Sequence, residues 1–356
     1  MASSSSYFSS TGGALGLPVK QHRNSFLLPP QGNEETRHEE SDPASPLPST
    51  AQTEQGQRPV DISVGVNRKN GGDLEVGVDR RDGDDDGPLA LVILNVRRDS
   101  ENRDLLRHLW DRAVIRLCAD GGANRLHDSF GDGADDSGGD QSEERARFVP
   151  DVIVGDLDSL RPEVARYYEG LGCEIALRPD QDHCDFEKCL MEVESRLPSS
   201  SRPVVGDEGG DGSESHGSTA AGSSPATVVG LGAFGGRFDH EMQAFSLLHT
   251  YTSRFDRFVL MGAGNVAFLL EPGLSHAVEP DLRFEGPTVG LIPVGGPCRK
   301  ITTEGLKWNL EGQGMEFGVL VSSSNCVVED VVRVVTDAPL VWTAEFNRTS
   351  WTGVVA

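Results

Sequence analysis

The spacing of hydrophobic and polar residues changes several times along the chain, and each change predicts a different element. Between Leu89 and Leu270, short apolar runs typical of strands buried on both faces alternate with stretches of helical spacing. We expect strands at Leu89–Asn95, Val114–Asp120, Asp151–Asp156, Cys173–Leu177 and Thr227–Gly232, and in the runs FVLMG and NVAFLL. Alternating strands and helices predict a parallel, doubly wound α/β sheet.

Helical spacing is clearest between Asp185 and Leu197. Apolar residues there fall three, four, seven and eleven positions after Phe186, which places them on one face of an amphipathic helix. Further helices are expected over Arg103–Ala113, after Asp120, from about Arg161 and after Gly236.

Beyond Glu271 the pattern becomes one of short strands. Runs such as VGLIPV, KITTEGLKWNL, EFGVLVSSS, VVRVVT and LVWTAEF are separated by Gly, Pro, Asn and Asp. This pattern predicts an all-β sandwich over residues 272–356, which follows an α/β domain over residues 89–271.

Three stretches lack any periodicity: residues 1–88, 131–147 and 198–225. Segments of this composition bury too little apolar surface to offset the entropy lost on ordering. We therefore predict a disordered N-terminal extension and two loop insertions. They carry more than half of the net charge of −24, so the acidity of the chain does not indicate a basic partner.

Composition also bears on partners and location. The chain has no basic stripe and no run of 18 apolar residues, so neither a nucleic acid nor a membrane is expected as a partner. The six cysteines form no CxxC pair, which favours reduced thiols and a cytoplasmic location. An organellar location is the alternative, because the first 33 residues are Ser-rich, contain Lys20 and Arg23 and lack the acids that transit peptides avoid.

Acidic side chains follow several predicted strands at the edge where open α/β sheets bind ligands. They are Asp120, the pair Asp156 and Asp158, and the pair Asp182 and Asp185. Neighbouring carboxylates repel one another, and a bound cation would relieve the repulsion. A group of carboxylate ligands with no cysteine thiolates among them favours a magnesium ion that also binds a substrate phosphate. After the strand at Thr227–Gly232, Gly235, Gly236 and Arg237 could donate to that phosphate at a helix start.

Each of these features has a plainer interpretation. GDLDS could be only a turn, and His240 could cap a helix. Asp182 and Asp185 could be the N-cap and third residue of the helix that follows them. In the stretch PDQDHCDFEKC, zinc is disfavoured because His183, Cys184 and Cys189 have no metal-finger spacing. A helix that starts near Asp185 puts Cys189 on its apolar face.

Seven motifs follow one another in the part of the chain from about Leu89 to Phe346: CADGGANRLHD, PDVIVGDLDSLRPEV, PDQDHCDFEKCL, GGRFDH, GLIPVG, TTEGLKWNL and LVSSSN. In this order and spacing they resemble the motifs of eukaryotic thiamine pyrophosphokinase. The resemblance implies an α/β catalytic domain followed by a thiamine-binding β-sandwich, in a homodimer with thiamine near the subunit interface. The implied reaction moves the pyrophosphoryl group of ATP to the hydroxyethyl oxygen of thiamine, giving thiamine diphosphate and AMP.

The resemblance also implies roles for residues. Asp156, Asp158 and Asp185 match the magnesium ligands, and the residues implied in catalysis are Asp120, Asp158, Asp185 and Arg237. The implied nucleotide and phosphate site contains Asp120, Asn124, Gln181, Lys188, Gly235, Gly236, Arg237 and Asp239. The implied thiamine-side residues are Trp308, Ser322 and Asn325. Asp158 or Asp120 is expected to accept the thiamine hydroxyl proton.

Three points depart from the family pattern or stay open. Cys184 stands where the family has threonine, and His240 where glutamine is common. Trp308 shares a strand face with Leu306 and Leu310 by periodicity, which predicts a core residue, whereas the resemblance implies stacking on thiamine. Two other functions remain as alternatives: a transferase acting on another heteroaromatic alcohol, and a non-catalytic vitamin- or nucleotide-binding protein.

Overall fold

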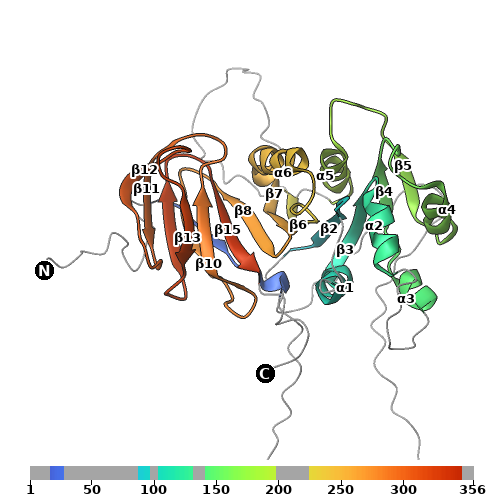
Figure 1. The fold of residues 1–356 in the computed structure, drawn as a ribbon, viewed down its shortest axis with the longest axis horizontal. Helices are drawn as coiled ribbons and strands as arrows, with labels where there is room; N and C mark the ends of the chain where they lie inside the picture. The colour runs from blue at the N-terminus through green and yellow to red at the C-terminus, as the bar shows by residue number, and fades with distance from the viewer. Residues whose placement is uncertain (1–16, 28–86, 97–102, 131–140, 198–223, 347–356) are drawn as a thin grey trace, which may run out of the picture. The chain divides into compact units, whose positions relative to one another are not determined.

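The computed structural model describes residues 17–27, 87–96, 103–130, 141–197 and 224–346 (Figure 1). Residues 1–16 and 28–86 of the predicted N-terminal extension lie outside these ranges, and so do residues 131–140 and 198–223 of the two predicted insertions. None of the helices in the described ranges is both long enough and apolar enough to cross a membrane.

The α/β part is built on six strands that all pair in parallel. They are β2 (Leu89–Ile93), β3 (Ala113–Ala119), β4 (Val152–Gly155), β5 (Glu174–Leu177), β6 (Ser224–Leu231) and β7 (Phe255–Gly262), in the order β7-β6-β2-β3-β4-β5. Every residue of β2 is buried, as its uniformly apolar sequence requires. The predicted doubly wound sheet is confirmed.

Helices cover both faces of this sheet. They are α1 (Arg103–Arg112), α2 (Gly122–Ser129), α4 (Pro162–Gly170), α5 (Asp185–Arg196) and α6 (Phe238–Tyr251). The helices α5 and α6 share a hydrophobic core with Ala90 and Val92 of β2, whereas α1 and α2 pack against the opposite face (Figure 1). The apolar face predicted for α5 is buried in that core, including Cys189, which is fully buried.

The sheet continues beyond β7 into the β-rich part. Four antiparallel strands, β8 (Asn265–Leu270), β15 (Leu340–Phe346), β10 (Glu285–Ile292) and β13 (Ser322–Cys326), extend it to the ten-stranded order β13-β10-β15-β8-β7-β6-β2-β3-β4-β5. Sequence reasoning placed a boundary between residues 271 and 272, directly after β8. The hydrogen-bonded ladder nevertheless joins the two parts in one sheet.

A second sheet has five strands in the order β1-β9-β14-β11-β12. They are β1 (Val19–His22), β9 (Ser275–Val278), β14 (Val332–Thr336), β11 (Cys298–Glu304) and β12 (Glu311–Met315). The ring of His22 stacks on that of Phe268 in β8 with centroids 4.8 Å apart, so side chains of the two sheets meet as in a sandwich.

The prediction of disorder is wrong for residues 17–27. Here β1 pairs in parallel with β9, and a 3-10 turn follows at Ser25–Leu27. Phe26 and Leu27 are each only 1% exposed, and Arg257 lies over the Phe26 ring. Burial of these two side chains and pairing with a strand more than 250 residues away order the segment.

Three smaller corrections concern other predicted loops and strands. Part of the first predicted insertion forms helix α3 (Gln141–Arg147), which Arg107 of α1 ties down through an ion pair with Glu144. The last residues of the second predicted insertion begin β6. The expected strand at KITTEGLKWNL ends at Glu304, because Gly305 turns the chain with a φ of 85°.

Two buried histidines lock β1 onto β9. His276 Nε2 donates to the carbonyl of Glu271 at 2.8 Å, which leaves Nδ1 of His276 to accept from His22 Nε2, also at 2.8 Å. The pair needs a neutral His276 ring, because its Nδ1 accepts, and burial of the His22 side chain disfavours a charge on that ring as well. Burial is the main cause that lowers the pKa of both histidines, and the positive charge of Lys20 adds to it.

We expect this pair to make the fold sensitive to acid. The unfolded histidines take up protons below about pH 6.5 while the folded pair resists, so the free energy of unfolding falls with pH, by up to about 1.4 kcal/mol per unit for each ring. In His22→Gln, which keeps a neutral donor, the loss between pH 7 and pH 5.5 should be smaller by about 1–2 kcal/mol. Urea unfolding of both proteins at several pH values measures this difference in the free energy of unfolding.

The matched control is His240→Gln, which removes an exposed histidine from α6. Other titrating groups cancel when the pH profiles of the variants are compared with wild type. Equal slopes for His22→Gln and wild type would contradict the prediction.

Candidate active site

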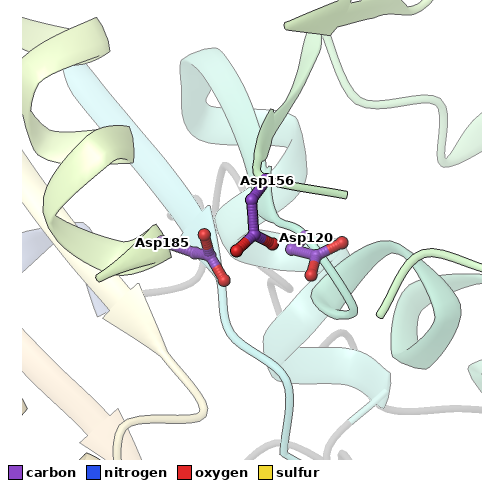
Figure 2. Close-up of side chains that lie close together, drawn as sticks. All are labelled: Asp120, Asp156 and Asp185. Carbon is purple, nitrogen blue, oxygen red and sulfur yellow. The ribbon is translucent and has the colours of Figure 1, made fainter. Parts of the chain in front are cut away.

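Three carboxylates meet at the carboxyl edge of the parallel strands. Asp120 follows β3, Asp156 follows β4 and Asp185 is the first residue of α5. One oxygen from each lies within 4.8 Å of the others, and Figure 2 shows the three side chains close together at this edge. We call them the three-carboxylate group. Asp156 and Asp185 were predicted magnesium ligands, whereas Asp120 was predicted as a catalytic and nucleotide-lining residue.

Asp120 is the buried member of the group, with only 2% of its surface exposed. Its backbone has a φ of 40°, in the left-handed region that residues with a Cβ seldom adopt. One carboxylate oxygen, Oδ2, accepts from the backbone N–H of Ser159 at 3.1 Å, and the buried Oδ1 has no hydrogen-bond partner. Burial, together with the other site carboxylates, raises the pKa of Asp120 to about 6.

Asp156 is held by donors on both of its oxygens. Gln181 Nε2 donates to Oδ2 at 2.9 Å, and the backbone N–H of Asp158 donates to Oδ1 at 3.3 Å. The Gln181 hydrogen bond is the main cause that lowers the pKa of Asp156. Gln181, predicted to line the phosphate site, therefore acts on the three-carboxylate group directly.

Asp185 is fixed by its place in α5. Cys184 is the N-cap, so Asp185 sits at the first helical position, where the helix dipole stabilises a negative charge. The alternative in which Asp182 caps the helix is therefore wrong. Lys188, one turn further and only 5% exposed, donates to Asp185 Oδ1 at 3.2 Å. The buried ammonium of Lys188 thus lies in direct contact with the carboxylate and offsets its negative charge.

Gly155 lets the three elements come together. A Cβ at this position would lie 2.7 Å from Asp120 Cβ and 3.0 Å from Asp185 Oδ1. Gly155 thus belongs to the site although sequence reasoning gave it no role. The signal was present in GDLDS, where a glycine precedes the acids at a strand end.

Other predicted residues lie outside the three-carboxylate group. Asp158 is exposed, and its Oδ1 accepts from the Ser159 hydroxyl at 2.9 Å. Arg237 is exposed and forms a 2.5 Å ion pair with Asp239. Asn124 holds the loop after β4, because it donates to the carbonyl of Ser159 at 2.7 Å and accepts from the N–H of Arg161 at 3.1 Å.

The glycine loop after β6, residues 232–236, lies against the end of β2. A Cβ on Gly236 would be 2.8 Å from Val96 Cγ2, and the N–H of Leu94 donates to the carbonyl of Leu231 at 2.9 Å. This is the topological switch point of the sheet, because β3 and β6 lie on opposite sides of β2. Gly235, with a φ of 90°, and Gly236 both donate to Glu241 Oε1, at 2.8 and 3.3 Å. Sequence reasoning missed Glu241.

The three predicted thiamine-side residues come together at the other end of the ten-stranded sheet. Asn325 in β13 is 3% exposed and accepts from the Trp308 N–H at 3.2 Å. It also donates to the Trp308 carbonyl at 2.9 Å and to Ser322 Oγ at 3.4 Å. The Trp308 side chain is 56% exposed, with Lys307 Nζ 4.6 Å from its ring centroid, so the core interpretation of Trp308 is wrong.

The stretch PDQDHCDFEKC shows no metal-finger arrangement. Cys189 is fully buried in the core, and His183 pairs with Asp180 at the surface. Burial raises the pKa of the half-buried Cys184 thiol, which favours its uncharged form. The residues that this stretch contributes to the site are therefore Gln181, Asp185 and Lys188.

Taken together, the fold and the site define a class. A parallel α/β sheet that gathers carboxylates at its strand ends, beside a glycine loop at the switch point, is typical of enzymes that act on phosphorylated nucleotides with a divalent metal.

Comparison with known proteins identifies the family. The pattern of the thiamin pyrophosphokinase catalytic domain matches residues 106–260, and that of the thiamin pyrophosphokinase vitamin B1 binding domain matches residues 275–341. Thiamine pyrophosphokinase 1 of Oryza sativa subsp. japonica is 40% identical over 260 residues, which cover 73% of this chain and 88% of that protein. Thiamine pyrophosphokinase 1 of Arabidopsis thaliana is 36% identical over 264 residues, covering 73% and 87%.

The fold agrees. The crystal structure of yeast thiamin pyrophosphokinase superposes with a TM-score of 0.62 at 25% identity, over 76% of this chain and 90% of that one. This chain belongs to the thiamin pyrophosphokinase family. The activity of the family is ATP-dependent transfer of a pyrophosphoryl group to thiamine, which gives thiamine diphosphate.

Gly155→Ala should damage this activity without unfolding the protein. The added methyl would meet Asp120 Cβ at 2.7 Å and push two carboxylates apart, so kcat should fall at least about tenfold. The matched control is Gly170→Ala at the end of α4, where an added Cβ meets nothing within 4 Å. Steady-state kinetics and circular dichroism of both variants provide the measurement. Wild-type kcat in Gly155→Ala would show that the close approach is dispensable.

Proposed function

We propose that the three-carboxylate group holds magnesium for the transfer of a pyrophosphoryl group from ATP to thiamine. The observation that carries this proposal is the convergence of Asp120, Asp156 and Asp185 within 4.8 Å, in a protein of this family. Three carboxylates this close need a counter-charge, which Lys188 supplies to only one of them.

The donor set fits a hard divalent cation. All three ligand atoms are carboxylate oxygens, and Oδ1 of Asp120 is buried without a hydrogen-bond partner. A buried acceptor without a partner is costly, and a cation would satisfy it. Magnesium suits such a set because it binds through a few carboxylates and keeps positions for water and substrate phosphates. When bound, it would neutralise charge that develops on the phosphoryl oxygens.

The chain's own residues then act around the phosphates. The thiamine hydroxyl oxygen forms a bond to the β-phosphorus of ATP as the bond from that phosphorus to the oxygen bridging it to the α-phosphorus breaks, and AMP leaves with that oxygen. Arg237, exposed at the start of α6, can turn from Asp239 toward the phosphates and stabilise the charge there. Lys188 keeps Asp185 in place.

We assign the proton acceptor for the thiamine hydroxyl to Asp158. Its carboxylate is exposed and lies outside the three-carboxylate group, so a bound cation does not occupy it. Asp120, the other candidate, is only 2% exposed and belongs to that group. The buried position leaves Asp120 poorly placed to reach a substrate hydroxyl.

The strand order supports a homodimer in which two chains complete each site. Seven hydrogen-bonded steps separate β13, which holds Trp308 through Asn325, from β3, which ends at the carboxylates. At about 4.8 Å per step these elements are roughly 30 Å apart, too far for one thiamine to touch both. The exposed Trp308 face, suited to a flat cation, would therefore serve the carboxylates of the partner.

A product assay tests the reaction. Wild type with ATP, magnesium and thiamine should form AMP and thiamine diphosphate in equal amounts, and Asp156→Asn should lose at least about 100-fold in kcat. The surface variant Asp111→Asn on α1 is the control with the same loss of charge. ADP as product would indicate an ordinary kinase, and absence of any nucleotide product would favour a binding protein.

Complementation tests the shared site. Asp185→Asn and Trp308→Ala should each be nearly inactive, but co-expressed chains should recover up to about one quarter of wild-type activity. Half of the dimers formed at random are mixed, and one of the two sites in each mixed dimer is intact. No recovery in dimers shown to be mixed would place both residues in one chain's site.

A further inference from the structure

The glycine loop after β6 is occupied by a side chain of this chain. Gly235 and Gly236 are exposed, and their N–H groups both donate to one carboxylate oxygen of Glu241, at 2.8 and 3.3 Å. Successive backbone N–H groups that converge on one oxygen form a concave anion site. Here the anion is the fourth residue of α6.

This contact differs from ordinary helix capping. The N-cap of α6 is Arg237, whose side chain forms no cap hydrogen bond. A capping box would bring the third helical residue back to the N-cap N–H. Glu241 is one position later and reaches the two residues before the N-cap, so it binds the glycine loop rather than the helix end.

The position of the loop points to what else could bind there. It packs against Val96 at the switch point of the sheet, where α/β proteins bind nucleotides. Phe238, directly beyond the loop, is 71% exposed, although an aromatic side chain usually finds a partner surface. The acids of the three-carboxylate group follow β3 and β4 on the other side of β2.

We propose that Glu241 is a built-in substitute for an ATP phosphate: its carboxylate occupies the N–H groups of Gly235 and Gly236 in the free protein, and a phosphate displaces it. This inference rests on the proposed function. A carboxylate and a phosphate cannot share the same two donors, because both are anions and accept the same protons. Glu241 therefore positions the empty loop and sets ATP affinity, without touching the reacting atoms.

The exchange costs little because the two donors are open to solvent and the Glu241 carboxylate is not fully buried. Both glycines are exposed and Glu241 is half-buried, so the released carboxylate can return to water. A neutral acceptor binds such N–H groups more weakly than a carboxylate does. Weakening the substitute should therefore tighten ATP binding, whereas removing a purely structural contact would loosen it.

The test is binding of an ATP analogue with a methylene bridge between the α- and β-phosphates, with magnesium, measured by calorimetry on the full chain. Glu241→Gln keeps the size but loses the charge, and Glu241→Asp keeps the charge but is too short to reach. In both variants we expect the Kd to fall about three- to tenfold and the KM for ATP to fall with it, at an unchanged KM for thiamine. Glu169→Gln on the exposed side of α4 is the matched control and should bind as wild type does.

Each result decides the question. Tighter binding in both variants supports the proposal. An unchanged or raised Kd in folded variants of an active wild type overturns it and leaves the proposed function intact. Tighter binding in Glu241→Gln alone also overturns it, because the effect would then come from net charge rather than from the occupied donors. A wild type that neither binds the analogue nor forms AMP overturns both the inference and the proposed function.

Discussion

Repulsion among three carboxylates is the constraint around which the rest of this structure is arranged. At separations near 5 Å and an effective dielectric constant of about 20, each charged pair costs on the order of 3 kcal/mol. The fold opposes that cost with particular residues. Gly155 lets β4 approach Asp120 closely. Lys188 and the α5 dipole offset the negative charge of Asp185, and Gln181 donates a hydrogen bond to Asp156. Asp120, buried in a left-handed backbone conformation, keeps the least compensation.

One continuous ten-stranded sheet both connects the carboxylates to the β-rich part and sets the distance between them. Because β8 pairs with both β7 and β15, the β-rich part continues the same hydrogen-bonded sheet as the strands that carry the carboxylates. The same pairing places Asn325, and Trp308 with it, seven strand steps from β3 at the far edge of the sheet. The N-terminal segment strengthens the frame, since His22 contacts β8 and β9 together.

Local patterns in the sequence were enough to predict the parallel strands, the α5 face and the clustering of acids at strand ends. They could not decide which acids converge. Asp156 and Asp158 are two residues apart, and only the turn between them, with Leu157 at a φ of 65°, sends one carboxylate inward and the other to solvent. The strand β1 escaped prediction for another reason. Its partner β9 lies more than 250 positions away, and no local periodicity signals such a pairing.

Trp308 shows how an alternating pattern can mislead when a glycine interrupts it. Leu306 and Leu310 are buried as the pattern predicts, but Gly305 ends the strand, and the turn that follows exposes the tryptophan between them. Asn325 makes that exposure stable, because it binds both the N–H and the carbonyl of Trp308 and so replaces the ladder that the turn has lost. Because both the oxygen and the nitrogen of the buried Asn325 amide are hydrogen-bonded, the exposed position of the Trp308 ring is held without an unsatisfied polar group in the interior.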